Sequence, residues 1–314
     1  MPVIAVEDIA YVRFEAPDLE LMERFLIDFG LVRAARTADT LYMRGKGSAP
    51  YVHITHQGPT ARGIGLGLRA QSSADLQRLA DHLGTGVEDS PEPAGGQVVR
   101  CTDPAGFRVE VLCGQTLAEP LAVRPSHQLN AADVRRRPQG AVRTAGGPSQ
   151  VMRLGHAVLF VPDFEPVFDF YHQVLGLRIS DSLHMQDPEK TTFAFLHCGL
   201  GARYTDHHTL ALGTPPGGIE SARFDHVAYE VLDLEDLQAG HAHLKAGGWR
   251  HSWGVGRHVL GSQLFDYWRD PFGHKVEHWT DGDLVNDQHQ PSHGPLQLEG
   301  LSQWAPPLTP EFFE

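Results

Sequence analysis

Apolar residues recur at helical spacing in two stretches that each follow a Pro-Asp pair. The first stretch covers residues 16–33 (APDLELMERFLIDFGLVR) and the second covers residues 161–178 (VPDFEPVFDFYHQVLGLR). Their periodic apolar positions are Leu19, Met22, Phe25, Leu26 and Phe29 in the first stretch and Phe164, Val167, Phe168, Tyr171 and Leu175 in the second. A period of about 3.6 residues with one apolar face predicts an amphipathic helix that covers a sheet.

Several short runs between these stretches have the composition of strands. They are rich in β-branched and aromatic residues, are bounded by Gly, Pro and Asp, and read HAVLFV, HHTLAL, DHVAYEV and HKVEHW. Such runs predict strands. Two further helices are predicted at 73–83 and 234–248, and each ends at glycine, which adopts a left-handed C-terminal conformation easily.

The chain repeats itself. Besides the two Pro-Asp stretches, residues 61–83 match 222–244, and DPAGFRVEVL at 103–112 matches DPFGHKVEHW at 270–279. Three segments repeated in the same order predict two similar folding units, each with the order strand, helix, strands given twice. The expected fold class is therefore α+β.

The repeat also predicts the domain boundaries. We expect a first unit over 1–115, a connector over 116–149 that mixes Pro, Gly and Arg without period, and a second unit over 150–283. The tail, residues 284–314, is proline-rich and irregular, and we expect it to pack as a strap or to lie loose.

Composition narrows the possible partners. The chain has 26 basic and 39 acidic residues and a net charge of −13, which disfavours nucleic acid and anionic membranes and favours a small-molecule partner. No signal peptide or membrane span is predicted. The three cysteines form no CxxC pair, so we expect no disulfide framework and a cytoplasmic location.

The repeat serves as an internal control for chemistry, because a residue special to one half is a candidate for function. Three positions stand out: His156 lies where the first half has Tyr11, His226 where it has Gly65, and Glu277 where it has Glu110. Strand alternation turns these side chains toward an interior. A core histidine bonded to a backbone carbonyl is one interpretation. The other is a metal site, because two imidazoles and one carboxylate form the facial triad of non-haem Fe(II) oxygenases, although zinc or manganese can use the same set.

With these residues on separate strands, the sequence resembles the type I extradiol ring-cleavage dioxygenases of the vicinal-oxygen-chelate superfamily. The resemblance spans both halves, is strongest over 150–285 and does not extend into the tail. It implies four βαβββ modules paired into two barrel-like domains, of which only the C-terminal one is catalytic. It also implies Fe(II) held by His156, His226 and Glu277, with Mn(II) as the alternative ion.

Further matches to that family assign roles around the metal. DHHTLAL resembles the strand with the catalytic acid-base histidine, which implies His208, and GRHVLGSQLFDYW places His258 and Tyr267 beside the substrate oxygens. The implied reaction is ring opening of a catecholic or trihydroxylated aromatic by O2, in a homo-oligomer. Gly261 and Trp253 stand where some relatives carry polar or basic residues, which favours a substrate without a carboxylate side chain.

The other histidines are expected to have no catalytic role, and two alternative functions remain open. We expect His207 to be a solvated or outer neighbour of His208. We expect His274 and His278 to be surface or structural, His241 and His243 to lie on a polar helix face with Lys245, and His289 and His293 to have no role. The rival functions are another vicinal-oxygen-chelate metalloenzyme, which isomerises, epimerises or transfers a thiol, and a module that only binds small aromatics.

Overall fold

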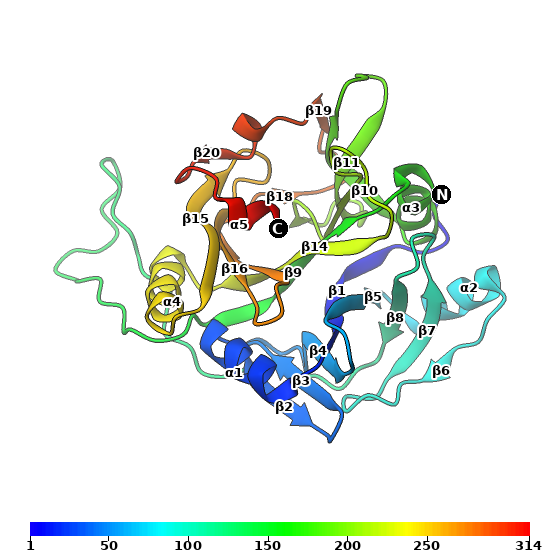
Figure 1. Cartoon of the computed structure of the whole chain (residues 1–314), viewed down its shortest axis with the longest axis horizontal. Helices are drawn as coiled ribbons and strands as arrows, with labels where there is room; N and C mark the ends of the chain where they lie inside the picture. Colours follow the sequence, from blue (N-terminus) through cyan, green and yellow to red (C-terminus); the bar gives the residue numbers. More distant parts are fainter.

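The computed structural model describes residues 1–314 and contains four βαβββ modules (Figure 1). The two modules of the N-terminal half are β1 (Val6–Ala16), α1 (Leu19–Phe29), β2 (Val32–Arg36), β3 (Thr40–Arg44) and β4 (His53–Gln57), then β5 (Arg62–Ala70), α2 (Ser73–Leu83), β6 (Glu88–Asp89), β7 (Gln97–Thr102) and β8 (Arg108–Cys113). They form one sheet in the order β2-β3-β4-β1-β5-β8-β7-β6, so the modules meet along the antiparallel pair β1 and β5.

The C-terminal half repeats this arrangement. Its modules are β9 (Val151–Phe160), α3 (Phe164–Asp169) with a π-helical continuation (Phe170–Val174), β10 (Leu177–His184), β11 (Thr191–Cys198) and β13 (Leu210–Gly213), then β14 (Arg223–Val231), α4 (Leu234–Ala246), β15 (Arg250–His258), β16 (Leu264–Arg269) and β17 (Lys275–Thr280). The two modules meet along the antiparallel pair β9 and β14. The α+β fold of paired modules is confirmed.

The strand registers show that the repeat is structural. Arg13 pairs with Gly65 across β1 and β5, as Val158 pairs with His226 across β9 and β14. In the neighbouring parallel ladders, Gly67 of β5 pairs with Glu110 and Ala228 of β14 pairs with Glu277. The two buried glutamates therefore occupy equivalent places in the two halves.

The predicted helices form for the expected local reasons. Asp18 caps α1, because its side chain accepts hydrogen bonds from the backbone N–H groups of Glu20 and Leu21. Gly30 ends α1 in a left-handed conformation with φ 112°. α4 ends at Ala246, two residues before the predicted end at 248; Gly247 stays right-handed with φ −71°, and Gly248 takes the positive φ of 75°.

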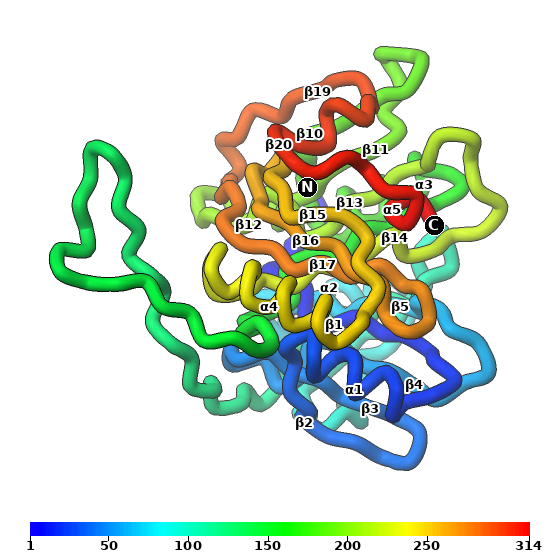
Figure 2. The backbone as a smooth tube through the Cα atoms, turned by 60° about the vertical axis from the view of Figure 1, so that its left-hand side comes forward, coloured from blue at the N-terminus to red at the C-terminus, as the bar shows by residue number.

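The two halves share one core. A cluster of 48 buried apolar residues draws on both halves, so neither half buries its apolar side chains alone. Backbone N–H groups of Val3 and Ile4 donate to the carbonyls of Gln173 and Val174, both at 3.1 Å, and Nδ1 of His53 lies 2.7 Å from the hydroxyl of Tyr229. Between β8 and β9 the chain forms no helix or strand and part of it projects from the body (Figures 1 and 2).

The tail packs on the C-terminal half as a strap. It forms β18 (Leu284–Val285), β19 (Ser292–Pro295), a 3-10 turn (Leu298–Gly300), β20 (Ser302–Trp304) and α5 (Pro310–Phe313). β19 pairs with β10 and β20 pairs with β15, so the tail extends the C-terminal sheet at both edges (Figure 2). No helix of the structure is long and apolar enough to cross a membrane.

Candidate active site

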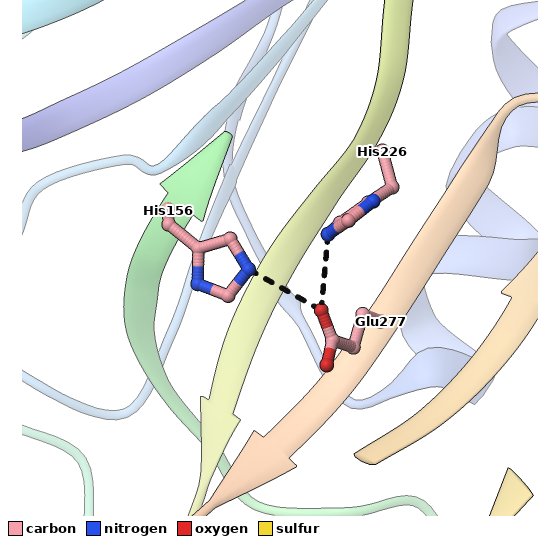
Figure 3. A group of neighbouring side chains, drawn as sticks. All are labelled: His156, His226 and Glu277. Atoms are coloured by element: carbon pink, nitrogen blue, oxygen red, sulfur yellow. Dashed lines mark ion pairs between the residues drawn. The ribbon is translucent and has the colours of Figure 1, made fainter. Parts of the chain in front are cut away.

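Three adjacent strands of the C-terminal sheet bring a candidate metal centre together. His156 lies on β9, His226 on β14 and Glu277 on β17, and these strands are neighbours in the sheet. Figure 3 shows the three side chains pointing toward one another. Nε2 of His156 and Nε2 of His226 each lie 3.3 Å from Oε2 of Glu277. The convergence predicted from the repeat is thus present in the structure.

The electrostatics of Glu277 fit a cation. Its side chain is 0 % exposed, and neither carboxylate oxygen has a hydrogen-bond partner. Burial acts to raise the pKa of Glu277, but the neighbouring imidazoles outweigh it and hold this pKa well below its usual range. A buried ionised carboxylate without partners is costly, whereas a divalent ion would satisfy it together with both imidazoles. The donor set therefore fits Fe(II), Mn(II) or Zn(II).

The equivalent glutamate of the N-terminal half is satisfied without an ion. Glu110 accepts from the hydroxyl of Tyr11 at 2.9 Å and from Nε of Arg13 at 2.5 Å. Nε of Arg100 and Nη2 of Arg108 add contacts at 3.0 and 2.5 Å. Guanidinium groups thus provide in one half the positive charge that the other half lacks.

A second layer of contacts orients His226. Its Nδ1 lies 2.7 Å from Oδ2 of Asp225, and Nζ of Lys275 lies 3.1 Å from Oδ1 of the same carboxylate. Burial acts to raise the pKa of Asp225, but Lys275 and His226 outweigh this effect and hold the pKa well below its usual value. Metal-binding histidines commonly donate their second ring N–H to a carboxylate. No role was predicted for Asp225 or Lys275, although they lie within the predicted strands DHVAYEV and HKVEHW.

The three residues with implied catalytic roles surround the centre. The ring of His208 lies 4.1 Å from the ring of His156, measured between centroids. Nε2 of His258 lies 2.9 Å from the hydroxyl of Tyr267 and 3.7 Å from Oε1 of Glu277. Burial lowers the pKa of His208 well below its ordinary value and raises that of Tyr267 well above it, so both groups are neutral.

Of the two expectations for His207, a solvated position is wrong, whereas a position as an outer neighbour of His208 agrees with the structure. His207 is buried, with its Nδ1 3.1 Å from Nδ1 of His208 and its Nε2 2.7 Å from Oδ2 of Asp181. The run HHTLAL is predicted as a strand, in which 207 and 208 would face opposite sides, but β13 begins only at Leu210. Both histidines lie in the preceding loop, where strand alternation does not apply.

A large cavity opens onto these side chains. Its volume is about 1240 Å³, and it is lined by His156, His208, His226, His258, Tyr267 and by segments of the N-terminal half and the tail. Its apolar walls include Val158, Phe193, Phe195, Trp253, Leu296 and Phe312. Trp253 both packs against Phe265 and lines this cavity.

A second cluster of two histidines and a carboxylate lies outside the cavity. Asp266 is buried, with Nδ1 of His241 3.1 Å away and Nε2 of His251 2.9 Å away, and Nε1 of Trp268 donates to it at 2.6 Å. Each carboxylate oxygen thus has a hydrogen-bond donor, unlike those of Glu277, and needs no ion. His241 consequently turns inward from the polar face on which it was expected.

Other histidines have structural contacts. His278 is buried and its Nε2 donates to the carbonyl of Phe29 at 2.7 Å, while Nδ1 of His274 lies 2.7 Å from Oδ2 of Asp270. The tail histidines, for which no role was expected, bond β10: Nε2 of His289 donates to the carbonyl of Ser180, and Nδ1 of His293 lies 2.8 Å from the hydroxyl of Ser182.

Comparison with known proteins agrees with this architecture. The family described as "Glyoxalase/Bleomycin resistance protein/Dioxygenase superfamily" matches residues 153–278. The chain is 33% identical to Metapyrocatechase 2 of Cupriavidus necator, over 98% of this chain and 92% of that protein. It is 28% identical to Biphenyl-2,3-diol 1,2-dioxygenase of Paraburkholderia xenovorans strain LB400, over 88% of this chain and 89% of that protein.

A solved structure shares the fold. The Mn(II)-bound glyoxalase from Novosphingobium aromaticivorans superposes with a TM-score of 0.79 at 24% identity, covering 98% of this chain and 94% of that one. Four βαβββ modules in two sheets define the vicinal-oxygen-chelate class of proteins. Within that class, the chain belongs to the extradiol ring-cleaving dioxygenases, which are oxidoreductases that use a catalytic metal.

Proposed function

We propose that His156, His226 and Glu277 bind Fe(II), with Mn(II) as the alternative ion, and that the enzyme opens an aromatic ring beside two adjacent hydroxyl groups. The observation that carries this proposal is the buried carboxylate of Glu277, whose two oxygens lack any partner within a ring of imidazoles. Three protein donors leave three positions of an octahedral ion free for two substrate oxygens and O2.

The bound metal would hold both reactants in one coordination sphere and lower the pKa of the substrate hydroxyls. His208 lines the cavity as a neutral imidazole and is placed to accept a hydroxyl proton and to return it later. His258 and Tyr267, joined at 2.9 Å, would both contact the second substrate oxygen: the unprotonated Nε2 of His258 would accept from its hydroxyl, and the Tyr267 hydroxyl would donate to it as charge develops. The product would be a ring-opened semialdehyde or related keto acid that contains both atoms of O2.

For the substrate we propose a catechol or trihydroxybenzene without a carboxylate side chain. Two of the cations that line the cavity are already engaged: Lys275 pairs with Asp225, and Arg269 donates to the carbonyls of Gly273 and Glu311. The indole of Trp253 lies at the wall where relatives of carboxylated substrates can use arginine. The names of the two relatives, a metapyrocatechase and a biphenyl-diol dioxygenase, fit a vicinal diol.

We also propose that residues 1–115 form a non-catalytic unit and residues 150–283 the catalytic one. The arginine contacts of Glu110 support this division, because they fill the place that corresponds to the metal centre. An isomerase or thiol transferase of the same class is disfavoured, since only three donors converge here and such enzymes usually need a fourth.

The test is anaerobic loading of the protein with Fe(II), followed by addition of catechols and trihydroxybenzenes with and without carboxylate side chains. O2 consumption should match the appearance of a coloured ring-fission product, with the uncarboxylated diols turned over fastest. Protein that binds the metal but consumes no O2 with any diol would contradict the proposed reaction and favour the isomerase class.

A further inference from the structure

A buried chain of three side chains ends at His208. Oδ2 of Asp181 lies 2.7 Å from Nε2 of His207, and Nδ1 of His207 lies 3.1 Å from Nδ1 of His208. All three residues are buried. The remaining ring nitrogen of His208, Nε2, has no hydrogen-bond partner in the protein, and the residue lines the cavity.

The ionised carboxylate of Asp181 fixes which groups donate and which accept in these hydrogen bonds. An ionised carboxylate only accepts hydrogen bonds, so Nε2 of His207 carries a proton. When His207 is neutral, its Nδ1 is an acceptor, and the proton between the rings belongs to Nδ1 of His208. Nε2 of His208 then has a free lone pair, as a general base requires.

The tail holds the carboxylate at the origin of this chain. The backbone N–H of Ser292 donates to Oδ1 of Asp181 at 2.8 Å, and the Ser292 hydroxyl donates to the same oxygen at 2.5 Å. Burial acts to raise the pKa of Asp181, but the hydrogen bonds from His207 and Ser292 outweigh it and keep this pKa below its usual value. Asp181 therefore remains an acceptor.

The tail fixes the other active-site histidine in the same way. Nδ1 of His258 donates to the backbone carbonyl of Leu301 at 2.7 Å. Because a carbonyl cannot donate, the proton of a neutral His258 is on Nδ1, and its Nε2 accepts from the Tyr267 hydroxyl at 2.9 Å. Two points of the tail thus act on two histidines that line the same cavity.

We propose that the tail, residues 284–314, sets the tautomers of both active-site histidines, so that Nε2 of each is unprotonated. It acts on His208 through Asp181 and His207, and on His258 through the Leu301 carbonyl. The catalytic meaning of this rests on the function proposed above. Asp181, His207 and Ser292 are positioning residues, since they reach the substrate only through His208. When His208 takes a substrate proton on Nε2, its Nδ1–H remains bonded to His207.

The tautomers can be read directly by NMR. The full chain, with ¹⁵N-labelled histidine and loaded with diamagnetic Zn(II), should show His208 and His258 protonated on Nδ1 and bare on Nε2 in long-range ¹H–¹⁵N spectra. A proton on Nε2 of His208, or protons on both nitrogens of His207, would overturn the proposal. This reading needs no substrate, so it is independent of whether any diol is cleaved.

Asp181→Asn should reverse the direction of the hydrogen bonds that link residue 181, His207 and His208. Ser292 still requires an acceptor, so the amide oxygen stays with Ser292 and the amide N–H₂ faces Nε2 of His207. The His207 proton then moves to Nδ1, and His208 is left with its proton on Nε2. With a diol that the wild type cleaves, kcat should fall by about 10²–10⁴-fold with KM little changed, because the base is blocked. Unchanged tautomers in this variant would overturn the proposal.

Two further variants distinguish the effect of the tail contacts from the effect of removing the Asp181 charge. Ser292→Pro removes both donors to Asp181, and it should leave His208 as a mixture of tautomers, whereas Ser292→Ala keeps the backbone donor and should have a smaller effect. A single unchanged tautomer in Ser292→Pro would overturn the role of the tail. The control is Asp28→Asn, which removes the same charge beside His243, 3.2 Å away, and should leave His208 as in the wild type.

Discussion

The two equivalent glutamates should respond differently to the same substitution. Glu110→Gln removes the negative charge that faces Arg13, whose side chain is only 1 % exposed and keeps only Glu92 as an ionic partner. Breaking one side of a buried ion pair costs about 3–5 kcal/mol, because the remaining charge stays desolvated. We therefore expect the free energy of unfolding to fall by about that amount, whether or not a metal is present.

Glu277→Gln removes a charge whose neighbours in the metal-free protein are imidazoles and not guanidinium groups. A neutral imidazole is not left as an unpaired buried charge when the carboxylate is removed, and an unbonded buried amide costs about 1–3 kcal/mol. In the presence of a chelator, Glu277→Gln should thus lose less stability than Glu110→Gln. Its gain on metal addition should be lost, while the wild type should gain about 2.7 kcal/mol at a free metal concentration of about 100 times Kd.

Urea denaturation of both variants and the wild type, with chelator or with Mn(II), measures these differences. The comparison is made at a pH of about 8, above the ordinary histidine pKa of about 6.5. Glu110→Gln serves as the matched control, since it should gain as much from Mn(II) as the wild type. The reasoning would be refuted if metal-free Glu277→Gln lost as much stability as Glu110→Gln, or if it kept the full stabilisation by Mn(II).

Three further changes have defined outcomes. His208→Asn should lower kcat by about 10²–10⁴-fold with metal content near that of the wild type, measured by atomic absorption; loss of the metal would contradict its assignment as a base. Asp225→Asn weakens the contact with Nδ1 of His226 and should lower metal affinity about 10–100-fold in competition with a chromogenic chelator; unchanged affinity would contradict the role of Asp225. Burial lowers the pKa of His53 from 6.5 to about 3, so below pH 6.5 the unfolded chain binds more protons and stability falls, by about 2 kcal/mol near pH 5. His53→Gln should flatten this dependence of the urea midpoint on pH, and an equally steep profile would contradict it.

The parts of the structure that sequence predicts are those governed by periodicity. The spacing of Leu19, Met22 and Phe25 predicted α1, and the offset between the two halves predicted which strands correspond. Because strand alternation and register are preserved in a repeat, the same reasoning identified His156, His226 and Glu277 as side chains that could meet.

The parts that sequence could not predict depend on contacts without a local pattern. Asp181 and His207 meet because β10 lies beside the loop that precedes β13, and neither segment signals this contact. The tail strands lack alternation, and they form because the main-chain groups of the sheet edges at β10 and β15 are free to pair. The inward turn of His241 likewise depends on Asp266, which lies on another element.

The contrast between Glu110 and Glu277 also bears on how long the protein survives in a cell. One half carries its positive charges in its own sequence, at Arg13, Arg100 and Arg108, whereas the proposed metal centre of the other half would obtain its cation from the surroundings. With that centre, metal starvation would weaken the C-terminal half and increase the time it spends locally open to proteases. The amount of enzyme in a cell would then depend on the supply of metal through degradation, without any separate sensor.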